Sequence, residues 1–164
     1  MKLYLIRHGI AQEPEPDQPD SQRVLTKEGY KKTRAVAQRL VELGVQVDVI
    51  LTSPYLRASQ TAVICHEAGM GPMPVVHEAL QPDGDWHQWL TWWQEWLDQG
   101  GGPVALVGHQ PDLGHWAERL VWGEARDKLV LKKAGVVLLE LPDQGSPVGQ
   151  AQLLWLLPPK VLVD

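Results

Sequence analysis

The chain has 164 residues and a hydrophobic fraction of 44%, which predicts a single domain over residues 1–164 with a core of its own. Its 15 Lys and Arg residues against 20 Asp and Glu give a formal charge of −5, which disfavours nucleic acid as a partner. The single cysteine excludes an internal disulfide. No apolar run is long enough for a signal peptide or a membrane span. We therefore expect a cytoplasmic protein with no membrane partner.

Apolar runs, caps and glycines predict strands that alternate with helices. Strands are expected at residues 2–6, 47–52, 74–77, 103–107, 135–141 and 152–157. Helices are expected at 27–43, 54–68, 86–97 and 111–122, the first three with Thr26, Ser53 and Asp85 as N-caps. The alternation indicates an α/β protein, a three-layer α/β/α sandwich around a mostly parallel sheet. The last two strands are predicted to add an antiparallel hairpin at the C-terminal end.

Two segments between these elements have unusual composition. Residues 12–22 hold three prolines and four acidic residues, which favours a solvated, mobile loop. Because this loop follows Arg7-His8-Gly9 closely, the alternative is that it borders a pocket. Tryptophans 86, 89, 93 and 96 recur at helical spacing, so we expect them to face the core rather than to bind a partner.

Arginine and histidine side chains follow three of the predicted strands. Arg7 and His8 come directly after the first strand, Arg57 lies in the first turn of the helix after the second, and His109 follows residues 103–107. Ligand sites of α/β folds lie at such strand ends. Taken singly, each of these histidines can be structural, and Arg57 can be a surface arginine paired with a carboxylate. Two fixed cations and two imidazoles at one edge would suit a phosphoryl group.

Three ordered motifs resemble the histidine phosphatase superfamily, which has the phosphoglycerate mutase-like fold. They are Arg7-His8-Gly9, residues 51–62 (LTSPYLRASQTA) and Val107-Gly108-His109. Within that superfamily, residues 23–29, 80–85 and 108–111 are similar to those of the short SixA-type phosphohistidine phosphatases of bacteria.

The resemblance implies a phosphatase that works without metal or cofactor. His8 would be the nucleophile and would become phosphohistidine, while Arg7, Arg57 and His109 would bind the transferred oxygens. Gly9, Arg23 and Ser53 are further candidates for substrate binding. For Arg23 the alternative is a loop arginine that anchors the acidic segment 12–22. Flanking arginines lower the pKa of His8 and a bound phosphate raises it, so we expect a neutral imidazole near pH 7.

The general acid of larger superfamily members has no counterpart in this chain. They carry a glutamate where this sequence has Gln81, which cannot donate a proton as an acid. Glu78, Asp83 and Asp85 are nearby substitutes, although each can equally be a turn or cap residue. Imidazole leaves phosphohistidine with little help, whereas an alkoxide needs a proton. The missing acid therefore favours a P–N bond as the substrate.

We thus predict a phosphatase of protein phosphohistidine, with the histidine phosphotransfer domain of a two-component phosphorelay as its partner. One alternative is a phosphatase of small phosphorylated metabolites, monoesters or nucleotides. The other is a non-catalytic module that binds phosphate or phosphoproteins. The tryptophan content and the tail strands also leave room for a homodimer.

Overall fold

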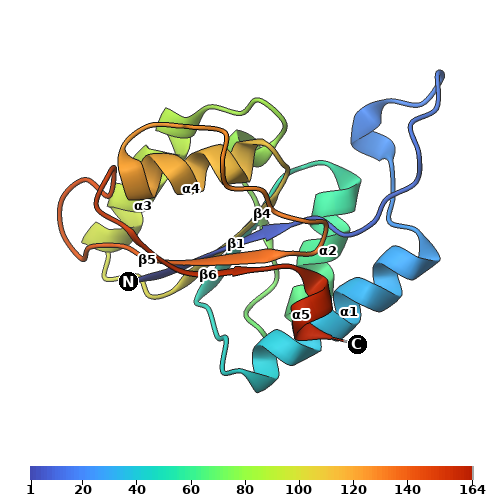
Figure 1. The fold of residues 1–164 in the computed structure, drawn as a ribbon, viewed down its shortest axis with the longest axis horizontal. Coiled ribbons are helices and arrows are strands. Elements are labelled where there is room, and N and C mark those ends of the chain that lie inside the picture. Colours follow the sequence, from blue (N-terminus) through green and yellow to red (C-terminus); the bar gives the residue numbers. More distant parts are fainter. Residues whose placement is uncertain (164) are drawn as a thin grey trace.

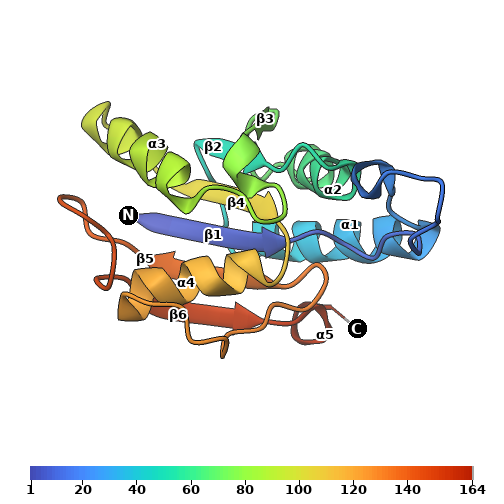
Figure 2. The same cartoon turned by 90° about the horizontal axis from the view of Figure 1, so that it is seen from above.

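The computed structural model describes residues 1–163, which form one six-stranded sheet with helices packed on both of its faces (Figures 1 and 2). The strands are β1 (Lys2–Arg7), β2 (Val49–Thr52), β3 (Val75–Val76), β4 (Val104–Gly108), β5 (Val136–Glu140) and β6 (Gln152–Leu157). The helices are α1 (Lys27–Glu42), α2 (Leu56–Glu67), α3 (Trp86–Asp98), α4 (Asp112–Trp122) and α5 (Pro159–Leu162), with short 3₁₀ turns η1 (Asp20–Gln22) and η2 (Glu78–Leu80).

The sheet has the order β3-β2-β4-β1-β5-β6. Strands β3, β2, β4 and β1 pair in parallel, whereas β5 and β6 extend the sheet by antiparallel pairing. This confirms the predicted mostly parallel sheet with an antiparallel hairpin at the C-terminal end. The parallel pairing also brings the carboxyl ends of β2, β4 and β1 to the same edge, where ligand sites of such sheets lie.

Two hydrophobic cores account for the three layers. Alternate residues of the strands, such as Ile6 and Leu5 of β1, point to opposite faces. Ile6 belongs to the core beneath α1, α2 and α5, and Leu5 belongs to the core beneath α3 and α4. Figure 1 shows α3 and α4 on one side of the sheet and α1 and α5 on the other. Trp89 and Trp93, both fully buried, fill much of the second core, as their helical spacing predicts.

Three local predictions need correction. Ser53 and Pro54 do not begin a helix: α2 starts at Leu56 after Tyr55, and the Ser53 hydroxyl accepts the Tyr55 N–H in a turn instead. The short helix α5 was not expected, because four residues are too few to show periodicity. The loop over residues 12–22 is tied down by η1 and by contacts of Asp20 described below. By contrast, Thr26 and Asp85 cap α1 and α3 as predicted.

No helix within residues 1–163 has the length and apolar character needed to cross a membrane.

Candidate active site

His8 directly follows β1, with only 6% of its surface exposed. Its N–H donates to the carbonyl of Gly108, the last residue of β4, which fixes the backbone at the junction of the two strands. The ring Nδ1 lies 2.7 Å from the carbonyl oxygen of Gly9. Since a carbonyl only accepts, Nδ1 must carry the proton. In the neutral ring the lone pair is therefore on Nε2, the atom that a nucleophilic histidine needs.

Burial keeps the two site histidines neutral. It is the largest cause that lowers the pKa of His8 from 6.5 to about 4, and nearby Arg57, Arg7 and Lys133 lower it further. Burial and the neighbouring His8 lower the pKa of His109 to about 3. The sequence indicated the arginines as a cause, but the larger effect is desolvation, which appears only once the strands are packed.

Glycine at position 9 allows the strand end to pack tightly against α1 and α2. A Cβ atom there would lie 2.2 Å from the Thr33 hydroxyl oxygen, too close for any side chain. The Gly9 N–H donates to the hydroxyl of Thr61 on α2. Gly9 thus holds His8 in place through its backbone.

Arg57, the second residue of α2, faces His8 from the neighbouring strand–helix junction. Its Nε lies 3.4 Å from His8 Nε2. Its Nη1 and Nη2 donate to the backbone carbonyl and the carboxylate of Asp20, at 2.8 and 3.0 Å. Arg23 donates to the other carboxylate oxygen of Asp20 and to the Gln12 carbonyl. The hydrogen bond from Arg23, with those from Arg57, lowers the pKa of Asp20 below its ordinary value.

His109 follows β4 and is held by Ser53, which follows β2. Its Nε2 lies 2.8 Å from the Ser53 hydroxyl, and its ring centre is 5.3 Å from that of His8. The Ser53 N–H donates to the carbonyl of Val107, so the parallel pairing of β2 and β4 sets this contact. Ser53 is completely buried, and its visible role is to orient His109.

Arg7 completes the group from the last position of β1. Its Nη1 donates to the carbonyl of Leu131, and its buried Nε has no hydrogen-bond partner within residues 1–163. A buried donor of this kind costs free energy unless an acceptor reaches it. A phosphoryl oxygen would be such an acceptor.

These side chains surround a cavity of ≈ 380 Å³. Its lining comprises Arg7, His8, Asp20, Arg23, Arg57, Pro82, Asp83, His109, Gln110, Pro111, Asp112 and Lys133. Five of the predicted site residues therefore meet here with Asp83, one of the three candidate acids. Gly9, Ser53, Glu78 and Asp85 are not in this lining. Asp85 instead accepts the His87 N–H as the cap of α3, and Glu78 is exposed in η2.

Three charged residues of the lining were missed by the sequence analysis: Asp20, Asp112 and Lys133. Asp20 belongs to the loop for which we expected solvation, and it joins Arg23 to Arg57. The loop therefore borders the pocket, which was the less favoured alternative. Arg23 both anchors the loop and lines the cavity, so its two predicted positions are compatible. Lys133 comes from a segment between α4 and β5 that carries no motif.

Asp112, the first residue of α4, accepts the backbone N–H of Asp83 at 3.0 Å. Asp83 has a φ of 60°, a conformation that suits a turn. Burial raises the pKa of Asp112 above its ordinary value, although the Asp83 hydrogen bond opposes this. The sequence feature that could have identified Asp112 is its position three residues after His109.

Comparisons with known proteins agree with this geometry. The sequence profile described as the histidine phosphatase superfamily (branch 1) matches residues 3–101. The chain belongs to this superfamily. It is 46% identical to an uncharacterized protein of Picosynechococcus over 84% of this chain and 83% of that one. It is 28% identical to the phosphohistidine phosphatase SixA of Escherichia coli, over 89% of this chain and 90% of that one.

Among solved structures, the protein histidine phosphatase SixA complexed with tungstate is similar over 99% of this chain and 100% of its own, with a TM-score of 0.87 and 26% identity. The phosphoglycerate mutase-like fold and the resemblance stated from the motifs are thus confirmed. Membership of the superfamily and the similarity to SixA identify the protein as a phosphatase. The alternative prediction of a non-catalytic binding module is therefore not retained.

Proposed function

We propose that this enzyme removes the phosphoryl group from phosphohistidine on a protein, with His8 as the nucleophile. The observation that carries the proposal is the protonation of His8, which is neutral with its proton on Nδ1. Its Nδ1 donates to the Gly9 carbonyl, so the lone pair of the neutral ring is on Nε2, which accepts a long 3.4 Å hydrogen bond from Arg57 Nε in a cavity lined by cations. This arrangement is what nucleophilic attack on a phosphoryl group requires.

In the first step, His8 Nε2 forms a bond to phosphorus as the P–N bond of the substrate breaks. The substrate imidazole leaves with the electron pair of that bond. When its other ring nitrogen already carries a proton, it leaves as neutral imidazole and needs no general acid. The Gly9 carbonyl retains the His8 Nδ1 proton, and it stabilises the positive charge that develops on the ring.

Two arginines of the cavity and the neutral His109 ring stabilise the charge of the transferred group by hydrogen bonding. Arg7, Arg57 and His109 are proposed to bind its three oxygens, and the N-terminus of α2, which carries Arg57, favours an anion at the same place. Both terminal nitrogens of Arg57 already donate to Asp20, one to its backbone carbonyl and one to its carboxylate. A phosphoryl group that binds these nitrogens must therefore share or replace those hydrogen bonds.

In the second step, a water molecule attacks the phosphorus of phosphohistidine on His8. The His8 N–P bond breaks, its electron pair returns to Nε2, and inorganic phosphate leaves. The positive charge on the phosphorylated ring makes His8 a good leaving group, so this step also runs without a bound metal ion. The proposed reaction therefore continues in the presence of a chelator.

Two features support phosphohistidine over an ester. Gln81 stands where the superfamily's glutamate is expected, and it is absent from the cavity lining. Two matches of stated activity above 25% identity cover almost the full length of both proteins; both are SixA phosphohistidine phosphatases, and one of them binds tungstate, a tetrahedral oxyanion like phosphate. Full-length structural matches at 18% identity include an alpha-ribazole phosphatase and a phosphoserine phosphatase, which share the fold. A phosphotransfer domain of a two-component relay is the corresponding substrate class.

One observation favours the second candidate, a phosphatase of small monoesters. Asp112 lines the cavity, and burial raises the pKa of its carboxyl group, which suits a proton donor to an alkoxide. It would take the role for which Glu78, Asp83 and Asp85 were considered.

The test compares turnover of a phosphohistidine-bearing phosphotransfer domain with that of a panel of monoesters and nucleotides, with a chelator present. The proposal predicts a kcat/KM for the phosphoprotein at least about 100-fold above that of any ester, a gap of some 3 kcal/mol in transition-state stabilisation. A preference for an ester would assign the enzyme to metabolites instead. His8→Ala is the control, and it must abolish both activities.

A further inference from the structure

A second cavity of ≈ 820 Å³ adjoins the catalytic one. Arg7 and Lys133 line both cavities, so these side chains form a wall that the two cavities share. No step of the reaction described above uses the larger one. We refer to it as the basic groove, and its lining consists of Arg7, Ile10, Lys32, Val130, Leu131, Lys132, Lys133, Leu156, Leu157, Pro158, Pro159 and Lys160.

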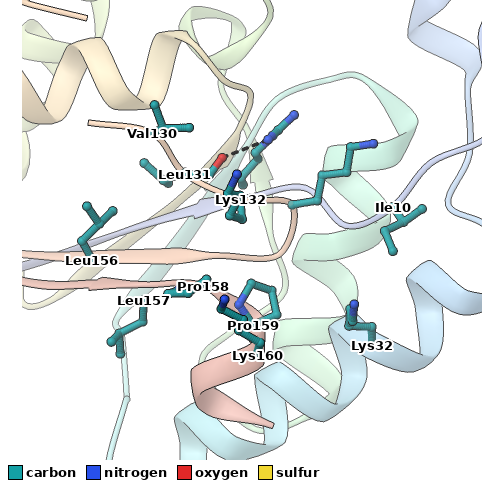
Figure 3. Close-up of a pocket in the computed structure, with 12 residues that line it drawn as sticks. Ile10, Lys32, Val130, Leu131, Lys132, Leu156, Leu157, Pro158, Pro159 and Lys160 are labelled. Carbon is teal, nitrogen blue, oxygen red and sulfur yellow. Dashed lines mark hydrogen bonds between the residues drawn. The ribbon is translucent and has the colours of Figure 1, made fainter. Parts of the chain in front are cut away.

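Four parts of the chain build the groove: residues 130–133, α1, the end of β6 with α5, and the end of β1 with the residues after it (Figure 3). The segment around Val130 and Lys132 forms one wall. Lys32 comes from α1 on the opposite side, and Lys160 comes from α5. The end of β6, with Leu156, lies between them.

The charge of the groove is opposite to that of the whole molecule. Five of its twelve lining residues are basic and none is acidic, although the chain carries a formal charge of −5. None of its four lysines forms an ion pair with a carboxylate within residues 1–163. Unpaired cations gathered in a concavity favour an anionic occupant.

The groove is also apolar, so a purely polar anion would not fill it. Val130 and Leu156 remain 53% and 39% exposed, and Leu157, Pro158 and Ile10 are partly exposed beside them. An occupant that covers these side chains would gain from their burial. The chemistry of the groove therefore matches a ligand with both carboxylates and apolar groups.

We infer that the basic groove binds an acidic, leucine-containing segment of the substrate protein, next to its phosphohistidine. This inference rests on the proposed function. The lysines come from separate elements, α1, α5 and the segment before β5, which suits several carboxylates spaced along a chain better than one small anion. A segment that leaves the catalytic cavity over the shared Arg7 and Lys133 side chains would reach the groove.

The experiment uses two synthetic peptides with histidine phosphorylated chemically, one flanked by Glu and Leu residues and the other by Ser and Gly. Wild-type enzyme is compared with Lys132→Glu/Lys160→Glu, whose lysines line the groove but not the catalytic cavity. The matched control is Lys31→Glu/Lys27→Glu, which makes the same charge change at exposed α1 positions outside the groove. All assays run at about 0.15 M salt, where surface charges beyond about 8 Å are screened.

We expect wild-type enzyme to prefer the Glu/Leu peptide in kcat/KM by about tenfold, as two exposed ion pairs with apolar contacts would provide. The groove variant should lose this preference and the control should keep it. An unchanged preference in the groove variant, or none in wild type, would overturn the inference.

Two further outcomes are separable. If the groove variant instead loses activity on 2-naphthyl phosphate and keeps the peptide preference, the groove serves small apolar phosphates and the inference is wrong. If both phosphohistidine peptides are poorer substrates than a monoester in every variant, the proposed function itself has failed.

Discussion

The proton on His8 decides what this site can do at the level of single residues. The Gly9 carbonyl holds that proton on Nδ1, and burial lowers the pKa to about 4. His8, the proposed nucleophile, is therefore neutral throughout the physiological range, and the neighbouring Arg7 and Arg57 also disfavour its charged form. Ser53 plays a comparable positioning role for the second histidine, because its hydroxyl contacts and orients the ring of His109.

Asp112 is the residue whose role separates the two candidate substrates. Asp112→Asn keeps an oxygen that can accept the Asp83 N–H, but it removes the acidic proton. We expect it to lower kcat on an alkyl phosphate by about 100-fold, the usual contribution of general acid catalysis, and to lower phosphohistidine turnover far less. The measurement is kcat for both substrates in the same preparation. Equal losses on both would mean that the departing imidazole also takes its proton from Asp112.

The sequence was most informative where a residue's neighbours in the chain determine its position. Arg7, His8, Arg57 and His109 follow strands, and parallel pairing brings strand ends together, so their meeting was predictable. Asp20, Asp112 and Lys133 reach the same cavity from a loop, a helix start and an irregular segment. Their positions depend on long-range packing, which no local pattern encodes.

Among the elements, α4 anchors the segment that carries Lys133, one of the two residues that line both cavities. Glu118 of α4 is fully buried, and its carboxylate accepts the backbone N–H groups of Asp127, Lys128 and Leu129. Burial alone would raise the pKa of Glu118, but these hydrogen bonds outweigh it and hold the pKa below its ordinary value. The anchored residues lead directly into the segment that carries Lys132 and Lys133.

Glu118→Gln is expected to destabilise the protein by about 1–3 kcal/mol, because an amide has one oxygen for three N–H groups and its NH₂ adds a buried donor. Urea unfolding measures the change. Glu95→Gln, at an exposed position of α3, is the control and should change stability by less than about 0.5 kcal/mol. An unfolding free energy equal to wild type in Glu118→Gln would show that the loop is held by other contacts.

The helix boundaries show which of the predicted N-cap residues cap a helix in the folded protein. Thr26 and Asp85 cap helices because their side-chain oxygens meet N–H groups two or three residues ahead. Ser53 has the same capping chemistry, and its hydroxyl accepts the Tyr55 N–H, but its backbone continues the β2–β4 pairing, its hydroxyl also contacts His109, and the chain forms a turn before α2. Tertiary pairing thus overrode a local preference at the position that supports His109.

At the scale of the whole molecule, the acidic chain concentrates cations at one edge of its sheet. The parallel strands position Arg7 and Arg57, and α1, the segment before β5 and α5 add the lysines of the basic groove. The fold class was predictable from the alternation of elements. The groove was not, because its residues come from parts of the chain far apart in sequence.

Burying two neutral histidines makes stability depend on pH. The pKa of His8 is about 4 in the folded protein and near 6.5 when unfolded, so between these values the unfolded chain binds more protons. Stability is therefore full above about pH 6.5 and falls as the pH drops towards 4. Between pH 7.5 and 5, wild type should lose about 2 kcal/mol more than His8→Gln. Denaturant unfolding at both pH values measures this, and parallel curves would contradict the burial of a neutral His8.

The most direct test of the account is to trap the phosphorylated enzyme. A ³²P-labelled phosphotransfer domain is mixed with the enzyme, the reaction is stopped in base, where phosphohistidine survives, and the labelled peptide is sequenced. The account predicts label on His8 alone, and none in His8→Ala, which should also be inactive. Label on another residue, or phosphatase activity that persists in His8→Ala, would contradict the assignment of His8 as the nucleophile.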